Sequence, residues 1–246
     1  SQSFNMSDTV NSMENFDYSN TEGACRFISS QTIGSKPFFL SFGLFNTHRE
    51  YPAAHSDIDA NYLAPPPVLY DCDVNRRDMA DYYESVRVVD QCFGLLLDAV
   101  DAAGIADDTM IIMTTDHGIA FPYMKCTLYD TGIGVALLIR LPKKYTQIKA
   151  TDALVSQIDL FPTICDAAGL KAPEWLEGKS LMPLLTGKTN HVRDEVFAEV
   201  TYHAAYEPKR CIRTNRYKLI RRYDYHNGPV PANIDDCISK AFIMEN

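Results

Sequence analysis

This chain of 246 residues lacks the features that mark membrane-spanning and nucleic-acid-binding proteins. It has no run of roughly 18 apolar residues, so we expect no transmembrane segment. Its 23 Lys and Arg are outnumbered by 32 Asp and Glu, and the net charge of −9 argues against a nucleic-acid partner. The 7 cysteines show no Cys-x-x-Cys spacing, which argues against a structural zinc site. What is present is a hydrophobic content of 46%, enough for the core of a globular protein.

The spacing of the apolar residues predicts an α/β domain. Two short apolar runs, 37–44 and 110–115, are typical of buried strands. Between them, residues 77–103 carry apolar side chains at helical spacing, which predicts a helix with one buried face. A strand over 134–141 and a helix over 159–168 are expected next. This order predicts a mainly parallel sheet flanked by helices.

The remaining segments indicate other structure. Residues 1–20 are polar and rich in Ser and Asn, so we expect them to be irregular, with a short helix over 21–30. A long irregular loop is expected over 46–75, and such loops usually cover a site. Short strand-like runs within 196–222 have no helix between them, which predicts a small antiparallel sheet.

The tripeptide Asp116-His117-Gly118 directly follows the apolar run 110–115. Open α/β sheets bind their ligands at this position, beyond the carboxyl end of a strand. A carboxylate oxygen beside an imidazole nitrogen can bind a divalent cation, and Gly118 lets the backbone turn away. Taken alone, such a tripeptide is more often an ordinary turn at a strand end.

Two further side chains extend this motif. His48 follows the end of the run 37–44, and Lys125 lies in the loop after Gly118. A cation and an ammonium could neutralise the oxygens of a tetrahedral oxyanion ester, while an imidazolium protonates the leaving oxygen. Taken singly, His48 would be a loop histidine bonded to backbone, and Lys125 a solvated loop lysine.

Several longer segments accompany these residues in a fixed order. They are Pro37-Phe38-Phe39-Leu40, Arg77-Asp78-Met79-Ala80-Asp81-Tyr82-Tyr83, Thr115-Asp116-His117-Gly118, Ile139-Arg140-Leu141-Pro142, Ser156-Gln157-Ile158-Asp159-Leu160-Phe161-Pro162-Thr163, Gly178-Lys179-Ser180-Leu181 and Arg213-Thr214-Asn215-Arg216-Tyr217-Lys218-Leu219-Ile220. In this order they resemble the sulfatases of the alkaline-phosphatase-like superfamily.

The resemblance implies a calcium-dependent sulfuric ester hydrolase that uses formylglycine as its nucleophile. Asp116 and His117 would supply metal ligands, Lys125 would bind sulfate, and His48 would assist the leaving group. His203 would contact the sugar, or else only pack at a domain junction. The expected partner is a sulfated carbohydrate, and the expected location is extracellular, periplasmic or lysosomal.

The sequence departs from the family's pattern near its start. Sulfatases carry an early Cys-x-Pro-Ser-Arg or Ser-x-Pro-x-Arg motif that yields formylglycine, an Asp-Asp metal pair and a Lys-x-His pair, and this sequence has none of them. We therefore expect residues 1–190 to be a partial catalytic α/β domain that lacks the nucleophile segment. Residues 191–246 would be part of a C-terminal antiparallel subdomain. Such a chain should be inactive alone, and its calcium site incomplete.

The sequence leaves other interpretations open. The run 209–222 holds seven basic residues and no acidic one, which favours a heparan-type glycan but also suits a solvated face. A phosphodiesterase, phosphonate hydrolase or phosphatase of the same superfamily is an alternative. Some of these enzymes place an Asp four residues before the histidine, where this chain has Leu44. A third possibility is a non-catalytic glycan-binding fragment or pseudoenzyme.

Overall fold

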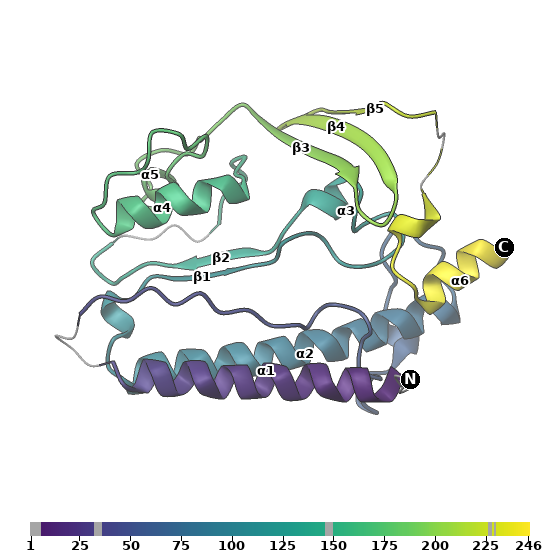
Figure 1. Ribbon diagram of the computed structural model, residues 1–246, viewed down its shortest axis with the longest axis horizontal. Coiled ribbons are helices and arrows are strands. Elements are labelled where there is room, and N and C mark those ends of the chain that lie inside the picture. The colour runs from purple at the N-terminus through teal and green to yellow at the C-terminus, as the bar shows by residue number, and fades with distance from the viewer. Residues whose placement is uncertain (1–5, 32–35, 146–149, 226–227, 229) are drawn as a thin grey trace.

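The computed structural model describes residues 6–31, 36–145, 150–225, 228 and 230–246. Two long helices, α1 (Met6–Ser29) and α2 (Asp73–Ala102), lie side by side along one face (Figure 1). Ala24 and Ile28 of α1 pack against Leu96 and Val100 of α2. The expected irregular structure over 1–20 is therefore wrong from Met6 onward, because a polar helix that packs one face on a neighbour needs few apolar residues.

Helix α2 matches the prediction from apolar spacing and begins four residues earlier, at Asp73. Gly104 follows it with a φ of 70°, a left-handed conformation that glycine adopts without strain. The loop expected over 46–75 is confirmed as irregular up to α2, apart from the short 3₁₀ turn η1 (Ala60–Tyr62).

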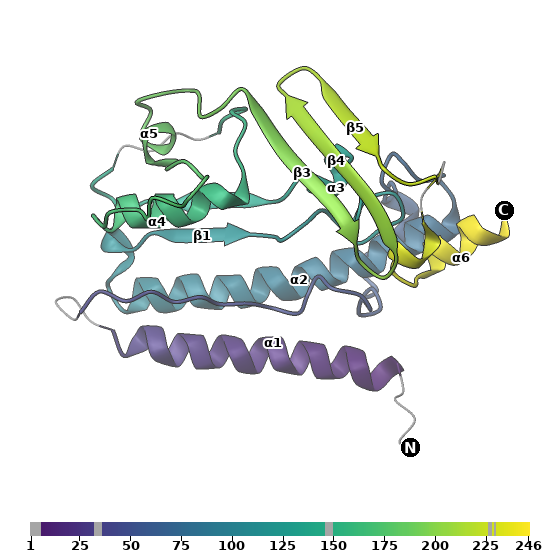
Figure 2. The same ribbon diagram turned by 45° about the horizontal axis from the view of Figure 1, so that its top comes forward.

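An extended segment, residues 36–45, runs along the helix pair in the same direction as β1 (Ile111–Thr114) (Figures 1 and 2). It contacts α1 through the ring pairs Phe38–Phe27 and Phe45–Phe16. The expected strand over 37–44 is wrong as a hydrogen-bonded strand, because no described strand pairs with this backbone. Phe39 is 73% exposed as a result.

The strands form two antiparallel sheets. β1 pairs with β2 (Leu137–Arg140) in the register Ile112 to Ile139. β3 (Glu195–Tyr202), β4 (Tyr206–Thr214) and β5 (Lys218–Arg222) form the second sheet in chain order, which is the predicted small C-terminal sheet. Parallel pairing is not found among the described strands.

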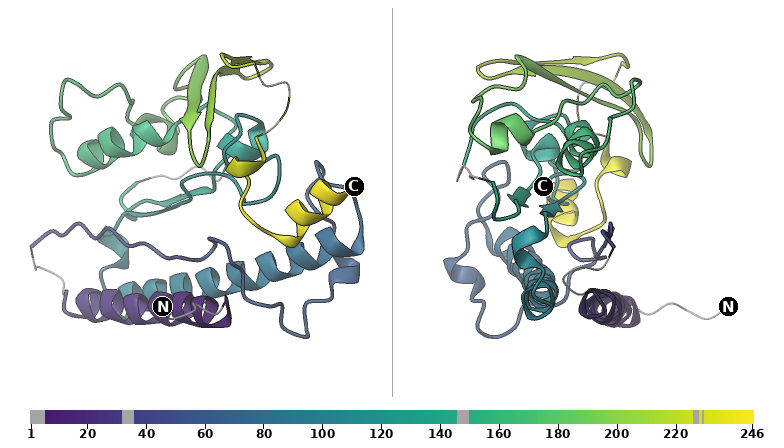
Figure 3. Two further views of the ribbon diagram at one scale, coloured as in Figure 1. Left: turned by 45° about the vertical axis from the view of Figure 1, so that its right-hand side comes forward. Right: turned by 90° about the vertical axis from the view of Figure 1, so that its left-hand side faces the viewer.

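The elements stack in layers (Figure 3). The helix pair lies on one side, β1 and β2 lie in the middle, and the β3–β5 sheet lies on the opposite side. The remaining helices and turns are η2 (Ala106–Asp108), α3 (Asp130–Ile133), η3 (Gln157–Asp159), α4 (Leu160–Ala167), α5 (Met182–Leu185), η4 (Pro231–Asn233) and α6 (Ile238–Glu245). The C-terminal α6 returns to pack on α2. Over the described residues, no helix combines the length and the apolar character needed to cross a bilayer.

Candidate active site

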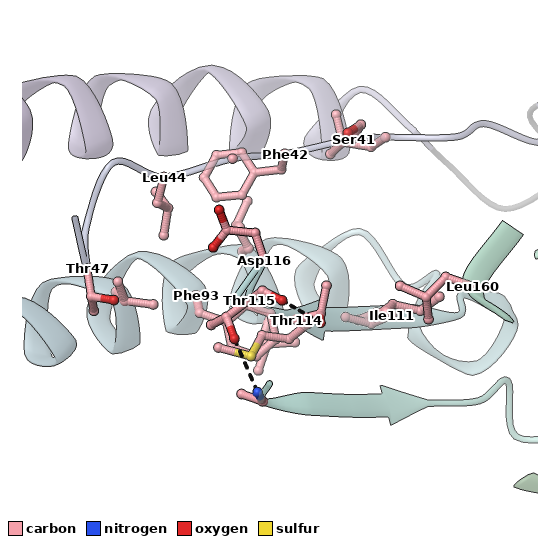
Figure 4. Close-up of a pocket in the computed structure, with 18 of the residues that line it drawn as sticks. Ser41, Phe42, Leu44, Thr47, Phe93, Ile111, Thr114, Thr115, Asp116 and Leu160 are labelled. Atoms are coloured by element: carbon pink, nitrogen blue, oxygen red, sulfur yellow. Dashed lines mark hydrogen bonds between the residues drawn. The ribbon is translucent and has the colours of Figure 1, made fainter. Parts of the chain in front are cut away.

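A cavity of ≈ 1830 Å³ lies between the extended segment, α2 and β1. His48, Asp116, His117 and Lys125 all line it, so the structure brings these four predicted residues to one cavity. Most of the other lining side chains are apolar. Figure 4 shows the Asp116 carboxylate beyond the end of β1, pointing into the space below the segment that carries Phe42 and Leu44.

Asp116 and His117 lie beside each other in this cavity. His117 Nδ1 lies 2.6 Å from the carbonyl oxygen of Gly118, so it is assigned as the donor of that hydrogen bond. Its Nε2 then carries a lone pair and lies 3.7 Å from Asp116 Oδ1. A carbonyl that fixes the tautomer of a histidine in this way is a usual feature of metal ligands.

The described residues do not complete a calcium site around this pair. No group of three or more His, Cys, Asp or Glu side chains with metal-binding geometry occurs among them. Calcium takes about six to eight oxygen ligands, most of them charged. Asp116 and His117 supply one carboxylate and one nitrogen, so they fit only part of a cation site.

Gly118 is required by packing as well as by the turn. A Cβ atom at this position would lie 1.9 Å from the carbonyl oxygen of Thr131. The Gly118 amide also donates to the carbonyl of Gly132 at 2.9 Å. The backbone after β1 that carries Asp116 therefore packs directly on α3 at Thr131 and Gly132, with no room for a side chain between them.

His48 and Lys125 meet at the same cavity. His48 Nδ1 lies 2.5 Å from the carbonyl oxygen of Arg49 and is assigned as its donor, which leaves Nε2 as an acceptor. Lys125 Nζ lies 3.5 Å from that Nε2. Lys125 is only 9% exposed, and its ammonium also contacts Asp235 Oδ2 at 2.8 Å. The alternative of a solvated loop lysine is therefore wrong.

The loop that carries Lys125 has an unusual backbone. Tyr123 and Cys126 have φ angles of 66° and 64°, in the left-handed region that residues other than glycine rarely adopt. The loop is held by Phe121 and Met124, which are each only 2% exposed. Such conformations persist where the surrounding packing enforces them, which is common at functional sites.

Arg49 connects the loops of the site, and the sequence motifs did not indicate it. Its guanidinium forms two hydrogen bonds with the Asp78 carboxylate of α2, at 2.6 and 2.9 Å, and a third with the carbonyl of Ala120 at 2.7 Å. It also stacks over Tyr51, with 4.2 Å between guanidinium carbon and ring centre. Ser239 of α6 donates to the same carboxylate at 2.5 Å. The residue next to His48 thus joins its own loop to α2 and to the Ala120 loop, and Asp78 extends the contact to α6.

The residues 230–239, here called the C-terminal arm, are tied to the second sheet by a buried carboxylate. Glu207 on β4 is 2% exposed and contacts Lys209 at 2.9 Å and Arg222 at 3.0 Å. Asn233 of the arm donates to Glu207 at 2.9 Å and accepts from the amide of Ala205 at 2.7 Å. Sequence reasoning missed this network because its members carry no motif.

The other predicted substrate contacts lie elsewhere. His203 is exposed in the turn between β3 and β4 and is not among the residues that line the cavity. Most of the basic run 209–222 is neutralised within the chain, by Glu199, Glu207, Asp130 and Asp224. Arg216 and Arg221 stack on Tyr217 and Tyr223 instead. The run is therefore less available to a polyanion than its sequence suggests.

The thiols of Cys25, Cys126 and Cys237 are not activated as nucleophiles. All 7 lie in the described part of the chain, and all are free thiols. Cys126 directly follows Lys125 and Cys237 lies in the C-terminal arm, and burial raises the pKa of both thiols. Cys25 lies within α1, and burial raises the pKa of its thiol as well. Raised pKa values keep these thiols protonated and unreactive at neutral pH.

Two protein-family models match this sequence. Residues 2–170 match the family model described as sulfatase, and residues 116–229 match that of the N-sulphoglucosamine sulphohydrolase C-terminal domain. The second match includes the β3–β5 sheet.

The chain is also similar to individual sulfatases. The human N-sulphoglucosamine sulphohydrolase is 29% identical over 86% of this chain and 49% of its own length. The N-acetylglucosamine-6-O-sulfatase of Bacteroides thetaiotaomicron is 32% identical over 59% of this chain and 28% of its own length. A structure from work on glycosaminoglycan metabolism by the same bacterium aligns with a TM-score of 0.70 at 23% identity, over 83% of this chain and 48% of that one. The chain thus spans about half or less of the length of these relatives.

Proposed function

The chain belongs to the sulfatase family, with an incomplete alkaline-phosphatase-like fold, and on that premise we propose that it forms part of a sulfuric ester hydrolase acting on a sulfated glycan. The observation that carries the proposal is the meeting of His48 and Lys125, 3.5 Å apart, in a cavity that Asp116 and His117 also line. These residues follow two separate segments that run in the same direction. An ammonium, an imidazole and part of a cation site suit a sulfate ester.

Each of these side chains has a proposed part in the reaction. The Lys125 ammonium donates to a non-bridging sulfate oxygen. His48, when protonated, gives its Nε2 proton to the leaving oxygen, while the Arg49 carbonyl holds the ring in place. Asp116 and His117 supply two ligands of a divalent cation, which would neutralise sulfate charge when bound. The sequence holds no match to the family's formylglycine motif, so we assign no nucleophilic step to this chain.

The substrate class is proposed from the relatives. Two of them are named for sulfated glucosamine, which favours glucosamine units that carry N- or O-sulfate. We keep His203 as a proposed sugar contact outside the cavity. We also propose the division into residues 1–190 and 191–246, and an extracellular, periplasmic or lysosomal location.

Turnover and binding by the isolated chain test the proposal. We expect no appreciable hydrolysis of an aryl sulfate or of N-sulfoglucosamine, because the nucleophile motif is absent. Calorimetry should still detect weak binding of N-sulfoglucosamine, and Lys125→Met should abolish it. The matched control is Lys143→Met, which removes an exposed lysine paired with Asp107. Turnover at normal enzyme rates would contradict the expectation that this chain alone is inactive. Binding that survives Lys125→Met would contradict the role assigned to Lys125.

Calcium titration tests the metal part separately. Because two ligands are far fewer than calcium takes, we expect weak binding that Asp116→Ala removes. Tight binding that depends on Asp116 would show that other groups of this chain complete the site.

A non-catalytic, glycan-binding protein is the second candidate, and it stays open because the given sequence contains no formylglycine motif. The gene sequence upstream of Ser1 separates the two candidates. An upstream Cys-x-Pro-Ser-Arg or Ser-x-Pro-x-Arg motif would support the hydrolase. A start codon with no such motif would support the binding protein.

A further inference from the structure

Asp235 lies beside the lysine that we assign to sulfate binding, although 110 residues separate the two in the sequence. Its Oδ2 is 2.8 Å from Lys125 Nζ, and the two side chains are only 20% and 9% exposed. Asp235 is not among the residues that line the cavity, whereas Lys125 is. The carboxylate therefore meets the ammonium from outside the cavity.

The fold holds Asp235 independently of this contact. On one side, Asn233 of the C-terminal arm is buried and bonded to Glu207 and to the Ala205 amide. On the other side, the buried Ser239 donates to Asp78. With an anchor on both sides, the arm presents the Asp235 carboxylate at a fixed place.

The contact restricts what the lysine can offer to a ligand. An ammonium has three N–H donors. One of them points to Asp235 Oδ2 at 2.8 Å, and while His48 is neutral the contact with its Nε2 at 3.5 Å takes a second direction. A single donor remains for a ligand in the cavity. The positive charge of Lys125 is also balanced by a carboxylate in direct contact.

We propose that Asp235 is a positioning and specificity-determining residue that makes the Lys125 site discriminate against dianions. This inference rests on the proposed function. Hydrolysis of a sulfate ester by water yields an alcohol, inorganic sulfate and a proton, so a monoanionic ester becomes a dianionic product. Repulsion by the Asp235 carboxylate is proportional to the charge of the ligand. Asp235 therefore favours the ester over inorganic sulfate and promotes product release.

The test compares two anions of different charge on the 246-residue chain. Calorimetry measures the affinities of inorganic sulfate and of methyl sulfate at neutral pH. Asp235→Asn should increase the affinity for inorganic sulfate by about tenfold. The affinity for methyl sulfate should rise by clearly less, because the lost repulsion scales with ligand charge. Asp235→Ala should shift the ratio of affinities in the same direction. The matched control, Asp236→Asn, should leave it unchanged, because Asp236 is 98% exposed and pairs with Lys240.

The outcomes separate this inference from the proposed function. If both Asp235 variants change the two affinities by the same factor, or not at all, the inference is wrong. In that case the proposed function still stands if both anions bind to the natural chain and Lys125→Met abolishes their binding. If Lys125→Met leaves anion binding unchanged, or if no variant binds either anion, the proposed lysine role and the inference both fail. Unfolding midpoints of all variants confirm that each is folded.

Discussion

Near the carboxyl end of β1, Arg49 and Lys125 each find a carboxylate partner within the chain, whereas along residues 36–45 the cavity wall is apolar and pairs with no described strand. At the polar end, Arg49 and Lys125 are nearly buried and each contacts a carboxylate. At the apolar end, Phe39 and Phe45 are at least half exposed.

The difference shows which contacts this chain can complete alone. The polar end uses segments far apart in sequence, and buried charges are tolerated only when such partners are in place. The apolar end has an extended backbone without a neighbouring described strand, and Phe39 and Phe45 stay largely exposed there although Phe42 packs on the α1–α2 core. The two ends should therefore respond differently to substitution.

The largest effect is expected at the buried Arg49–Asp78 pair. Arg49→Met should lower the free energy of unfolding by about 3–5 kcal/mol, because it leaves the Asp78 carboxylate buried without its cation. The control is Arg76→Met, which breaks a similar two-bonded pair with Asp71 at the surface and should cost far less. Urea denaturation measures both. Equal losses would mean that burial does not distinguish the two pairs.

Substitutions of buried and exposed apolar side chains should also differ in their effect on stability. Leu96→Ala, in the contact between α1 and α2, should cost about 2–5 kcal/mol, because it opens a cavity in a packed core. Phe39→Ser should change stability by no more than about 0.5 kcal/mol. It should also reduce binding of a hydrophobic dye to the folded chain. A large stability loss for Phe39→Ser would show that residues 36–45 are buried in solution.

Two glycines, one in a crowded place and one in an open place, test how tightly the backbone after β1 is packed. Gly118→Ala should cost about 1–3 kcal/mol, because its Cβ would overlap the Thr131 carbonyl. Gly94→Ala, within α2 and with no atom near its new Cβ, should stabilise the chain by about 0.5–1 kcal/mol. Thermal unfolding of both variants gives the comparison. A neutral Gly118→Ala would mean that the Asp116 loop moves freely away from α3.

The smallest effect concerns Asp81 on α2, near the polar end. Partial burial raises the pKa of its carboxyl above the usual value of 3.8. The folded chain therefore holds this proton more tightly than the unfolded chain, and stability falls as pH rises from the unfolded to the folded pKa. Asp81→Asn, whose amide oxygen can still accept from the Ala54 amide, should remove that loss. Its stability relative to the natural chain should be higher at pH 7 than at pH 3. The opposite sign would show that Arg49 outweighs burial.

The sequence by itself determined features that depend on neighbouring residues. Apolar spacing predicted α2 and β1, and three strand-like runs predicted the β3–β5 sheet. The position of Asp116, His48 and Lys125 after such runs predicted that they meet, and the four-residue set does line one cavity. The predictions of helices and strands hold because their periodicity depends only on residues that are close in the sequence.

Only the tertiary structure decided which distant groups pair. The contact between Lys125 and Asp235 spans 110 residues, and that between Asp78 and Ser239 spans 161. Arg49 and Asp235 carry no periodic signal, because a buried ion pair depends on the arrangement of whole segments and not on local spacing. The extended segment 36–45 is the converse case. Its sequence is that of a buried strand, but a strand forms only where a neighbouring backbone supplies the hydrogen bonds.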